Sequence, residues 1–262
     1  MLALEEAHRS DTDLDEIQRL AAVRRGYARK LAHGLLAKGW LERVGRGRYV
    51  LNVSGRGPDI VPETDPLRLG SRLVAPYYFG YATAAELWGL LLRPGRTYYI
   101  VTPTRTSVHL DGPSTFRIVR ASPHRFFGAT TVSRRGEALY VSDRERTVLD
   151  CLERPEFSGG FAGAVGVLAR ASGKLSARRL TAYLKRLGSR SLRARIGFLL
   201  ERIHAARGSE QGGAVDWLPA PDAPWVPLAP PSEYGRSGRR DPRWRVVQNL
   251  PDAELLAEVE AR

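Results

Sequence analysis

The sequence has a single cysteine, Cys151, among its 262 residues, so it can form neither an internal disulfide nor a cysteine-rich zinc site. It also lacks any apolar run near the roughly 18 residues that a membrane-spanning helix requires. Its first residues, MLALEEAHRSDTD, are acidic and do not show the basic-then-apolar order of a signal peptide. We therefore expect a cytoplasmic protein without a membrane partner.

Signatures of catalysis are scarce as well. The five histidines lack the HxxxH or HExxH spacing of a metal site, and no GxSxG nucleophile elbow is present. The segment GFAGAVG lacks the GK[ST] of a phosphate-binding loop, and close helix packing accounts better for its glycines. Cys151 lies in the apolar stretch TVLDCL, which is typical of an inert buried thiol. These absences predict no catalytic residues, no metal and no cofactor.

Lysine is rare too, because only four of the 41 basic residues are lysine and the rest are arginine. A GC-rich genome would account for this preference, but not for the net charge of +13 or the sequence pI near 10.4. The planar guanidinium fork suits phosphates and guanine edges. A polyanionic partner is the expectation for such a chain.

The N-terminal region shows two amphipathic segments followed by a hairpin. DLDEIQRL predicts a short helix capped by Thr12 or Asp13, and RRGYARKLAHGLLAKG predicts a second helix that stops at Gly39. WLERVGRGRYVL then predicts two strands, 40–44 and 48–51, around a Gly-Arg-Gly turn. This order predicts a winged helix-turn-helix DNA-binding domain over residues 1–52.

Positive charge is concentrated in the second helix and the hairpin of this region. Residues 18–51 contain nine basic side chains and one acid, whereas residues 1–17 contain one basic side chain and six acids. We expect the second helix to enter the major groove and the hairpin to lie along the duplex. The alternative is a solvated basic surface on a domain that uses this fold for protein contacts. The predicted DNA-binding residues are Arg24, Arg25, Tyr27, Arg29, Lys30, His33, Arg43, Arg46 and Arg48.

The rest of the chain predicts a linker and a larger domain. Residues 53–66 hold three prolines without a helical period, which is typical of an extended linker. Over 67–262 we expect a mixed α/β domain: a buried helix at 81–92, four strands, and a mostly helical second half. The proline- and tryptophan-rich stretch 214–245 is expected to wrap the surface. The predicted fold class is therefore α+β.

A second basic cluster lies on the predicted helices of the larger domain, with almost no acidic residue among its members. It predicts either a second surface for nucleic acid or another partner, or an ordinary solvated helical face. Its residues are Arg178, Arg179, Lys185, Arg186, Arg190, Arg193 and Arg195.

Four stretches resemble the AbiEi-type antitoxins, the transcriptional regulators of abortive-infection (type IV) toxin–antitoxin systems. They are GWLERVGRGRYVL, DPLRLGSRLVAPYYFGYATAAELWGL, YYIVTPTR and, most specifically, VSDRERTVLDCLERPEFSGGFAGAV at residues 141–165. The resemblance implies an autorepressor that binds inverted repeats in its own promoter. It also implies a second domain that counteracts a nucleotidyltransferase-type toxin in phage defence, in many cases without a stable complex.

Two hypotheses that assign the chain a different class of function remain open. One is a nuclease or nucleotide-processing enzyme that the basic N-terminal domain delivers to DNA, although no acidic cluster supports it. The other is a regulator whose larger domain senses a small ligand.

Overall fold

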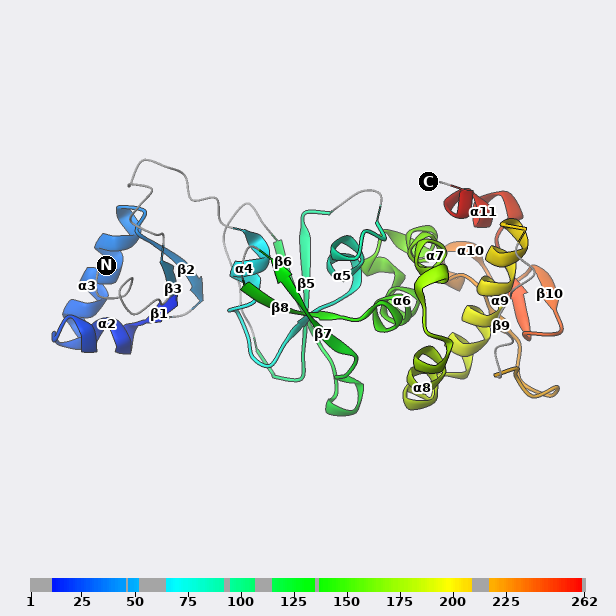
Figure 1. The fold of residues 1–262 in the computed structure, drawn as a ribbon, viewed down its shortest axis with the longest axis horizontal. Helices are drawn as coiled ribbons and strands as arrows, with labels where there is room; N and C mark the ends of the chain where they lie inside the picture. The colour runs from blue at the N-terminus through cyan, green and yellow to red at the C-terminus, as the bar shows by residue number, and fades with distance from the viewer. Residues whose placement is uncertain are drawn as a thin grey trace. The chain divides into compact units, whose positions relative to one another are not determined.

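The computed structural model describes residues 11–45, 47–51, 65–91, 95–106, 115–134, 137–208 and 217–260. Within these ranges the fold is α+β, as predicted, with helices and mixed sheets (Figure 1). None of the helices in the described ranges combines the length and apolar character needed to cross a bilayer.

The chain divides into two compact units that interleave along the sequence. Unit 1 takes residues 1–77, 96–120 and 133–139, and unit 2 takes residues 78–95, 121–132 and 140–262. The predicted boundary between residues 52 and 67 does not coincide with this division and stays a prediction. Most of the predicted linker lies outside the described residues, and its last two residues begin a short helix in which Asp65 caps Leu67.

The N-terminal part of unit 1 consists of a helix pair and a three-stranded antiparallel sheet in the order β1-β3-β2. The carboxylate of Asp13 caps the first helix by accepting from the Glu16 backbone N–H at 2.7 Å, which selects one of the two predicted caps. Ile17, Ala28 and Tyr49 are buried together between helices and sheet. The elements are β1 (Asp11–Asp13), α2 (Leu14–Leu20), α3 (Arg25–Ala37), β2 (Leu41–Gly45) and β3 (Arg48–Leu51).

A five-stranded mixed sheet runs through the middle of the sequence in the order β6-β5-β4-β8-β7. Strands β5 and β6 pair in parallel from Thr97↔Thr115 to Thr102↔Arg120. The four strands predicted in this region are present. The elements are α4 (Pro66–Gly70), β4 (Tyr78–Phe79), α5 (Tyr81–Leu87), β5 (Thr97–Thr102), β6 (Thr115–Arg120), β7 (Ala129–Arg134) and β8 (Glu137–Ser142).

Unit 2 is built around helices whose apolar faces share one core. Leu149, Leu168 and Ile196 come from three different helices, and each is fully buried. Gly163 lies so close to the Ser158 carbonyl that a β-carbon would approach it to 2.1 Å, so close packing explains this glycine, as predicted. The helices are α6 (Arg144–Glu153), α7 (Gly160–Ala171), α8 (Ala177–Leu187), α9 (Arg190–Ala206), α10 (Pro231–Tyr234) and α11 (Asp252–Glu260), with 3₁₀ turns at Pro123–Arg125, Pro155–Phe157 and Ser172–Lys174.

Most residues in the described part of the stretch 214–245 are exposed or half-buried, in line with the expected surface position, but the stretch also forms a small sheet. Strand β11 (Val246–Gln248) pairs with β9 (Val226–Pro227) in parallel and with β10 (Arg239–Asp241) in antiparallel orientation. Trp217 and Trp244 are buried in the core of unit 2. The segment is therefore a small sheet anchored by tryptophans.

Candidate nucleic-acid interface

Helix α3 has one buried apolar face and one exposed face that carries most of its charged residues. Ala28 and Ala32 point into the core and are almost fully inaccessible. Arg24, at the N-cap position, and every other candidate on this helix are exposed to solvent. Those other candidates are Arg25, Tyr27, Arg29, Lys30 and His33.

The start of α3 carries no negative charge of its own. Arg24 occupies the N-cap position without forming a side-chain cap, and the first turn contains no acidic residue. A helix N-terminus bears partial positive charge from its backbone N–H groups, which favours a phosphate. Tyr27 adds an aromatic ring that is 56% exposed near the same end.

One of the candidate cations is already paired. A guanidinium nitrogen of Arg25 lies 2.8 Å from a carboxylate oxygen of Asp15 in α2, and both side chains are more than half exposed. Such a surface pair contributes at most about 1 kcal/mol and is screened by salt. Arg25 is therefore held near α2 but remains accessible.

The hairpin of β2 and β3 follows α3 directly. Arg43 is exposed on β2, and the register shifts between Arg43 and Gly45, where the strand bulges. Arg48 pairs through its backbone with Asp13 and Gly45, but its side chain lies outside the described part of the chain. Arg46, at the tip of the turn, is likewise outside the described residues.

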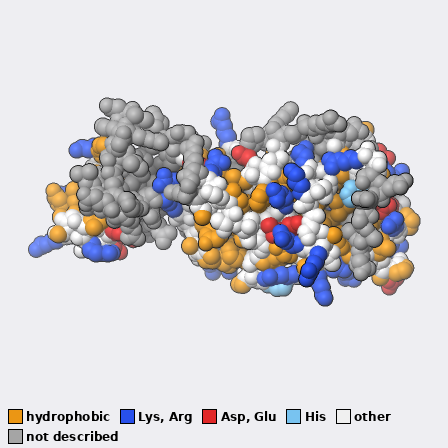
Figure 2. All heavy atoms as spheres, in the orientation of Figure 1, with side chains coloured by type: hydrophobic (Ala, Val, Ile, Leu, Met, Phe, Trp, Pro, Cys, Tyr) orange, Lys and Arg blue, Asp and Glu red, His pale blue; other side chains and the backbone are white. Residues whose placement is uncertain are grey.

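Some members of the second predicted cluster form contacts within unit 2, and others have no acidic partner in the described part of the chain. Arg178, Lys185 and Arg190 are exposed, and no described acidic side chain pairs with them. Figure 2 shows Lys and Arg side chains spread over the visible described surface, with fewer Asp and Glu. Arg193 is half-buried near the start of α9. Three members of the cluster form contacts within unit 2, namely Arg179, Arg186 and Arg195.

These three arginines contact unit 2 itself. Arg195 Nε donates to the Pro227 carbonyl at 2.9 Å, and burial lowers the pKa of its guanidinium. Arg186 Nε donates to the His124 carbonyl at 3.1 Å and lies over the ring of Phe127. Structural contacts therefore account for part of this cluster.

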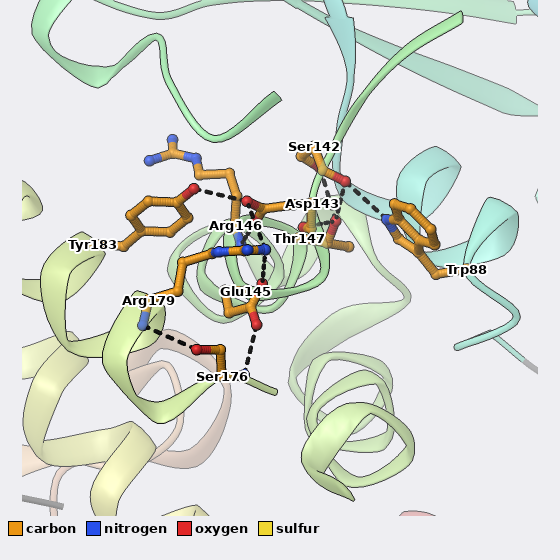
Figure 3. A network of polar contacts seen from close by, with 9 residues as sticks. All are labelled: Trp88, Ser142, Asp143, Glu145, Arg146, Thr147, Ser176, Arg179 and Tyr183. Carbon is orange, nitrogen blue, oxygen red and sulfur yellow. Dashed lines mark hydrogen bonds and ion pairs between the residues drawn. The ribbon is translucent and has the colours of Figure 1, made fainter. Parts of the chain in front are cut away.

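Arg179 belongs to a polar network at the start of α6 (Figure 3). The Asp143 carboxylate caps α6 at Arg146 and accepts from the Tyr183 hydroxyl at 2.7 Å. Burial raises the pKa of Asp143 against the lowering effect of these hydrogen bonds. Glu145 accepts from the backbone N–H of Ser176 at 2.6 Å and from Arg179 at 3.3 Å.

The same network reaches α5 and β8. The indole N–H of Trp88 donates to the Ser142 carbonyl at 2.8 Å, and the Ser142 hydroxyl is hydrogen-bonded to Thr147. Residues 142–147 thus join α5, α6 and α8 within unit 2. The acidic side chains of this network are hydrogen-bonded to neighbouring residues of unit 2, so we assign the network to the stability of the fold.

The described part of the chain contains no group of three or more His, Cys, Asp or Glu side chains placed to hold a metal ion. The sequence-based predictions do not include one basic cluster. The run RSGRRDPRWR at residues 236–245 is an arginine cluster of its own, and its composition alone would have revealed it.

The comparisons with known proteins bear on the fold alone. No protein-family model matches the chain, and no curated protein matches it. A crystal structure of the RV2827C protein from Mycobacterium tuberculosis is similar, with a TM-score of 0.66 and 19% sequence identity. The similarity covers 97% of this chain and 91% of that one, so the two share their architecture over nearly their whole length.

Proposed function

We propose that residues 11–51 are a winged helix-turn-helix that binds duplex DNA, with α3 in the major groove. The sheet order β1-β3-β2 and the helix pair between β1 and β2 support this assignment. The proposed role of the β2–β3 hairpin is to lie along the adjacent backbone.

The observation that carries the proposal is the outer face of α3. Arg29, Lys30 and His33 lie within one turn of each other, are exposed, and stabilise no core. A recognition helix needs such a row of side chains because base edges and phosphates are reached only from an outward face.

We further propose that the protein represses its own operon and acts as the antitoxin against a nucleotidyltransferase-type toxin. The resemblance of residues 141–165 to AbiEi-type antitoxins supports this role. The proposed activity is binding rather than catalysis, with inverted repeats in the promoter as the operator.

A promoter reporter tests repression directly. The DNA upstream of the gene is fused to a reporter, and the wild-type chain is compared with Arg29→Ala/Lys30→Ala. We expect repression by the wild type and its loss in the variant, at equal protein levels. Co-expression with the neighbouring toxin gene then tests rescue of growth. Repression that survives in the variant would show that α3 is not the reading element.

A further inference from the structure

The second candidate surface lies at the C-terminal sheet of unit 2. We call residues 236–245 the arginine hairpin, because they hold five arginines and one acid, Asp241. Asp241 is used internally, since its carboxylate accepts from the backbone N–H of Trp244 at 2.8 Å. Four of the arginines are exposed: Arg236, Arg239, Arg240 and Arg243.

The hairpin is rigidly anchored to α9. The Trp244 side chain is 1% exposed, and its indole N–H donates to Glu201 at 2.6 Å. Its ring fills the space over Gly197, where a β-carbon would lie 2.0 Å from the ring. Arginines on a fixed support lose less conformational freedom when they bind a ligand.

Two of the arginines gather around one indole ring. The guanidinium carbon of Arg245 lies 4.3 Å from the Trp225 ring centroid, and that of Arg240 lies 5.2 Å from it. Arg245 is held in place, because its Nε donates to the Ala223 carbonyl at 2.7 Å and its backbone adopts a φ of +54°. A positive φ at a non-glycine residue persists only where surrounding contacts enforce it.

The remaining arginines differ in how strongly they are engaged. Arg239 lies 4.0 Å from Asp252, and Arg243 lies 3.4 Å from Glu201. No described acidic side chain pairs with Arg240, whose contact is the Trp225 ring. Arg240 thus presents a guanidinium group supported by an aromatic ring and open to solvent.

We propose that the arginine hairpin binds single-stranded nucleic acid, independently of α3. An unpaired base stacks on the guanidinium plane of Arg240, and the neighbouring arginines contact the phosphates on either side. A duplex hides its base faces from such a plane. A protein partner calls for an apolar centre, and residues 236–245 expose no large hydrophobic side chain.

The test uses the full chain carrying Arg29→Ala/Lys30→Ala, so that the proposed operator contact does not contribute. Fluorescence anisotropy follows a labelled RNA strand of about ten nucleotides. We expect Arg240→Ala to weaken binding about tenfold, in line with the loss of one stacked base. Arg240→Lys should weaken it nearly as much while keeping the salt dependence, because lysine retains the charge but has no plane. The matched control is Arg207→Ala, an exposed arginine of the same unit, with less than a twofold effect.

Three further probes separate the alternatives. A DNA strand of the same sequence should bind as well as RNA, since the stacked plane does not read the 2′-hydroxyl; a preference for one identifies the natural source. Equal binding of a matched duplex or of poly-glutamate, with the same response to Arg240→Ala, would show a bare cationic patch and overturn the proposal. So would failure to bind any single strand. These outcomes leave operator binding by α3 untouched, because it is measured on the chain with an intact α3.

Discussion

The ion pair of Arg25 and Asp15 lies on the surface that we propose to bind DNA. The pair is exposed, so it adds little to the stability of the fold, but it places a carboxylate beside the start of α3. Asp15→Asn removes that charge and releases the guanidinium. We expect duplex affinity to rise by a few fold, with the free energy of unfolding changed by less than about 0.5 kcal/mol.

Titration of an operator duplex with both proteins measures this effect, and Arg25→Ala serves as the opposing variant. Weaker binding by Asp15→Asn would mean that the pair orients Arg25 for contact and does not withhold it.

The buried pair of Arg146 and Asp150 behaves differently. Nitrogen and oxygen are 2.8 Å apart, and the two side chains are 3% and 2% exposed. We expect Arg146→Met to lower the free energy of unfolding by about 3–5 kcal/mol, because it leaves the buried Asp150 carboxylate without its counter-charge. The double variant Arg146→Met/Asp150→Leu should lose much less than the sum of its single changes. Urea unfolding of the four proteins provides the cycle, and additive losses would refute the coupling.

Asp150 also makes the free energy of unfolding depend on pH. Burial raises the pKa of Asp150 to about 6, above the value near 4 of an unfolded aspartate. A raised pKa means that the folded state holds the proton more tightly, so this contribution to stability is full below pH about 4 and is lost as the pH rises through 6. The stability of wild type relative to Asp150→Asn should therefore decline between these values. A flat difference would indicate an unperturbed carboxyl.

At the scale of elements, two glycines on α3 call for explanation. Gly26 and Gly34 are exposed, and an added β-carbon at either position would meet nothing within 4 Å. Glycine in a helix costs about 1 kcal/mol relative to alanine, so neither residue serves the packing of the fold. Gly26 lies one turn before Arg29 and Lys30, where the proposed groove contact requires close approach.

Gly26→Ala should therefore stabilise the protein by up to about 1 kcal/mol and at the same time weaken duplex binding. Gly34→Ala is the matched control, because it makes the same change nearer the other end of the helix. It should stabilise the protein without a loss of affinity. Thermal unfolding measures the stability of each variant, and an operator titration measures its duplex affinity. If Gly26→Ala bound the duplex as well as wild type, the start of α3 would not approach the DNA closely.

The elements that the sequence predicted well are those with local signals. Asp13 is one of the two caps that the sequence predicts for α2, and it accepts from a backbone N–H three residues on. The helix expected at 81–92 ends at Leu87, since Gly89 adopts a φ of +67°.

Other elements had no local signal to find. Strand β1 is three polar residues long, so it shows no alternation, and only its pairing with β3 makes it a strand. The stretch 214–245 carries no local sign of its small sheet, and the burial of Trp244 depends on Gly197 in a distant helix. Such contacts join residues far apart in sequence, and no periodicity records them.

For the candidate site, the sequence located the exposed cations of α3 but could not separate free arginines from engaged ones. Arg179 and Arg195 belong to a basic run, yet Glu145 and the Pro227 carbonyl bind them. Whether an arginine faces solvent or a buried acceptor is decided by tertiary packing.

At the scale of the whole molecule, the net charge of +13 means that the affinity of the protein for a polyanion should depend on salt concentration. Each contact between a cation of the protein and a DNA phosphate releases counterions. The logarithm of the binding constant then falls against the logarithm of the salt concentration with a slope of about −0.9 per contact. Nonspecific attraction and contact by α3 can thus be separated by comparing slopes.

The most direct measurement is the binding of the full chain to the duplex upstream of its gene, over a series of salt concentrations, for wild type and Arg29→Ala/Lys30→Ala. The account predicts tight binding by the wild type, a large loss of affinity in the variant, and a slope shallower by up to about two contacts. Equal affinities and equal slopes for the two proteins, or no duplex binding by the wild type at low salt, would contradict it.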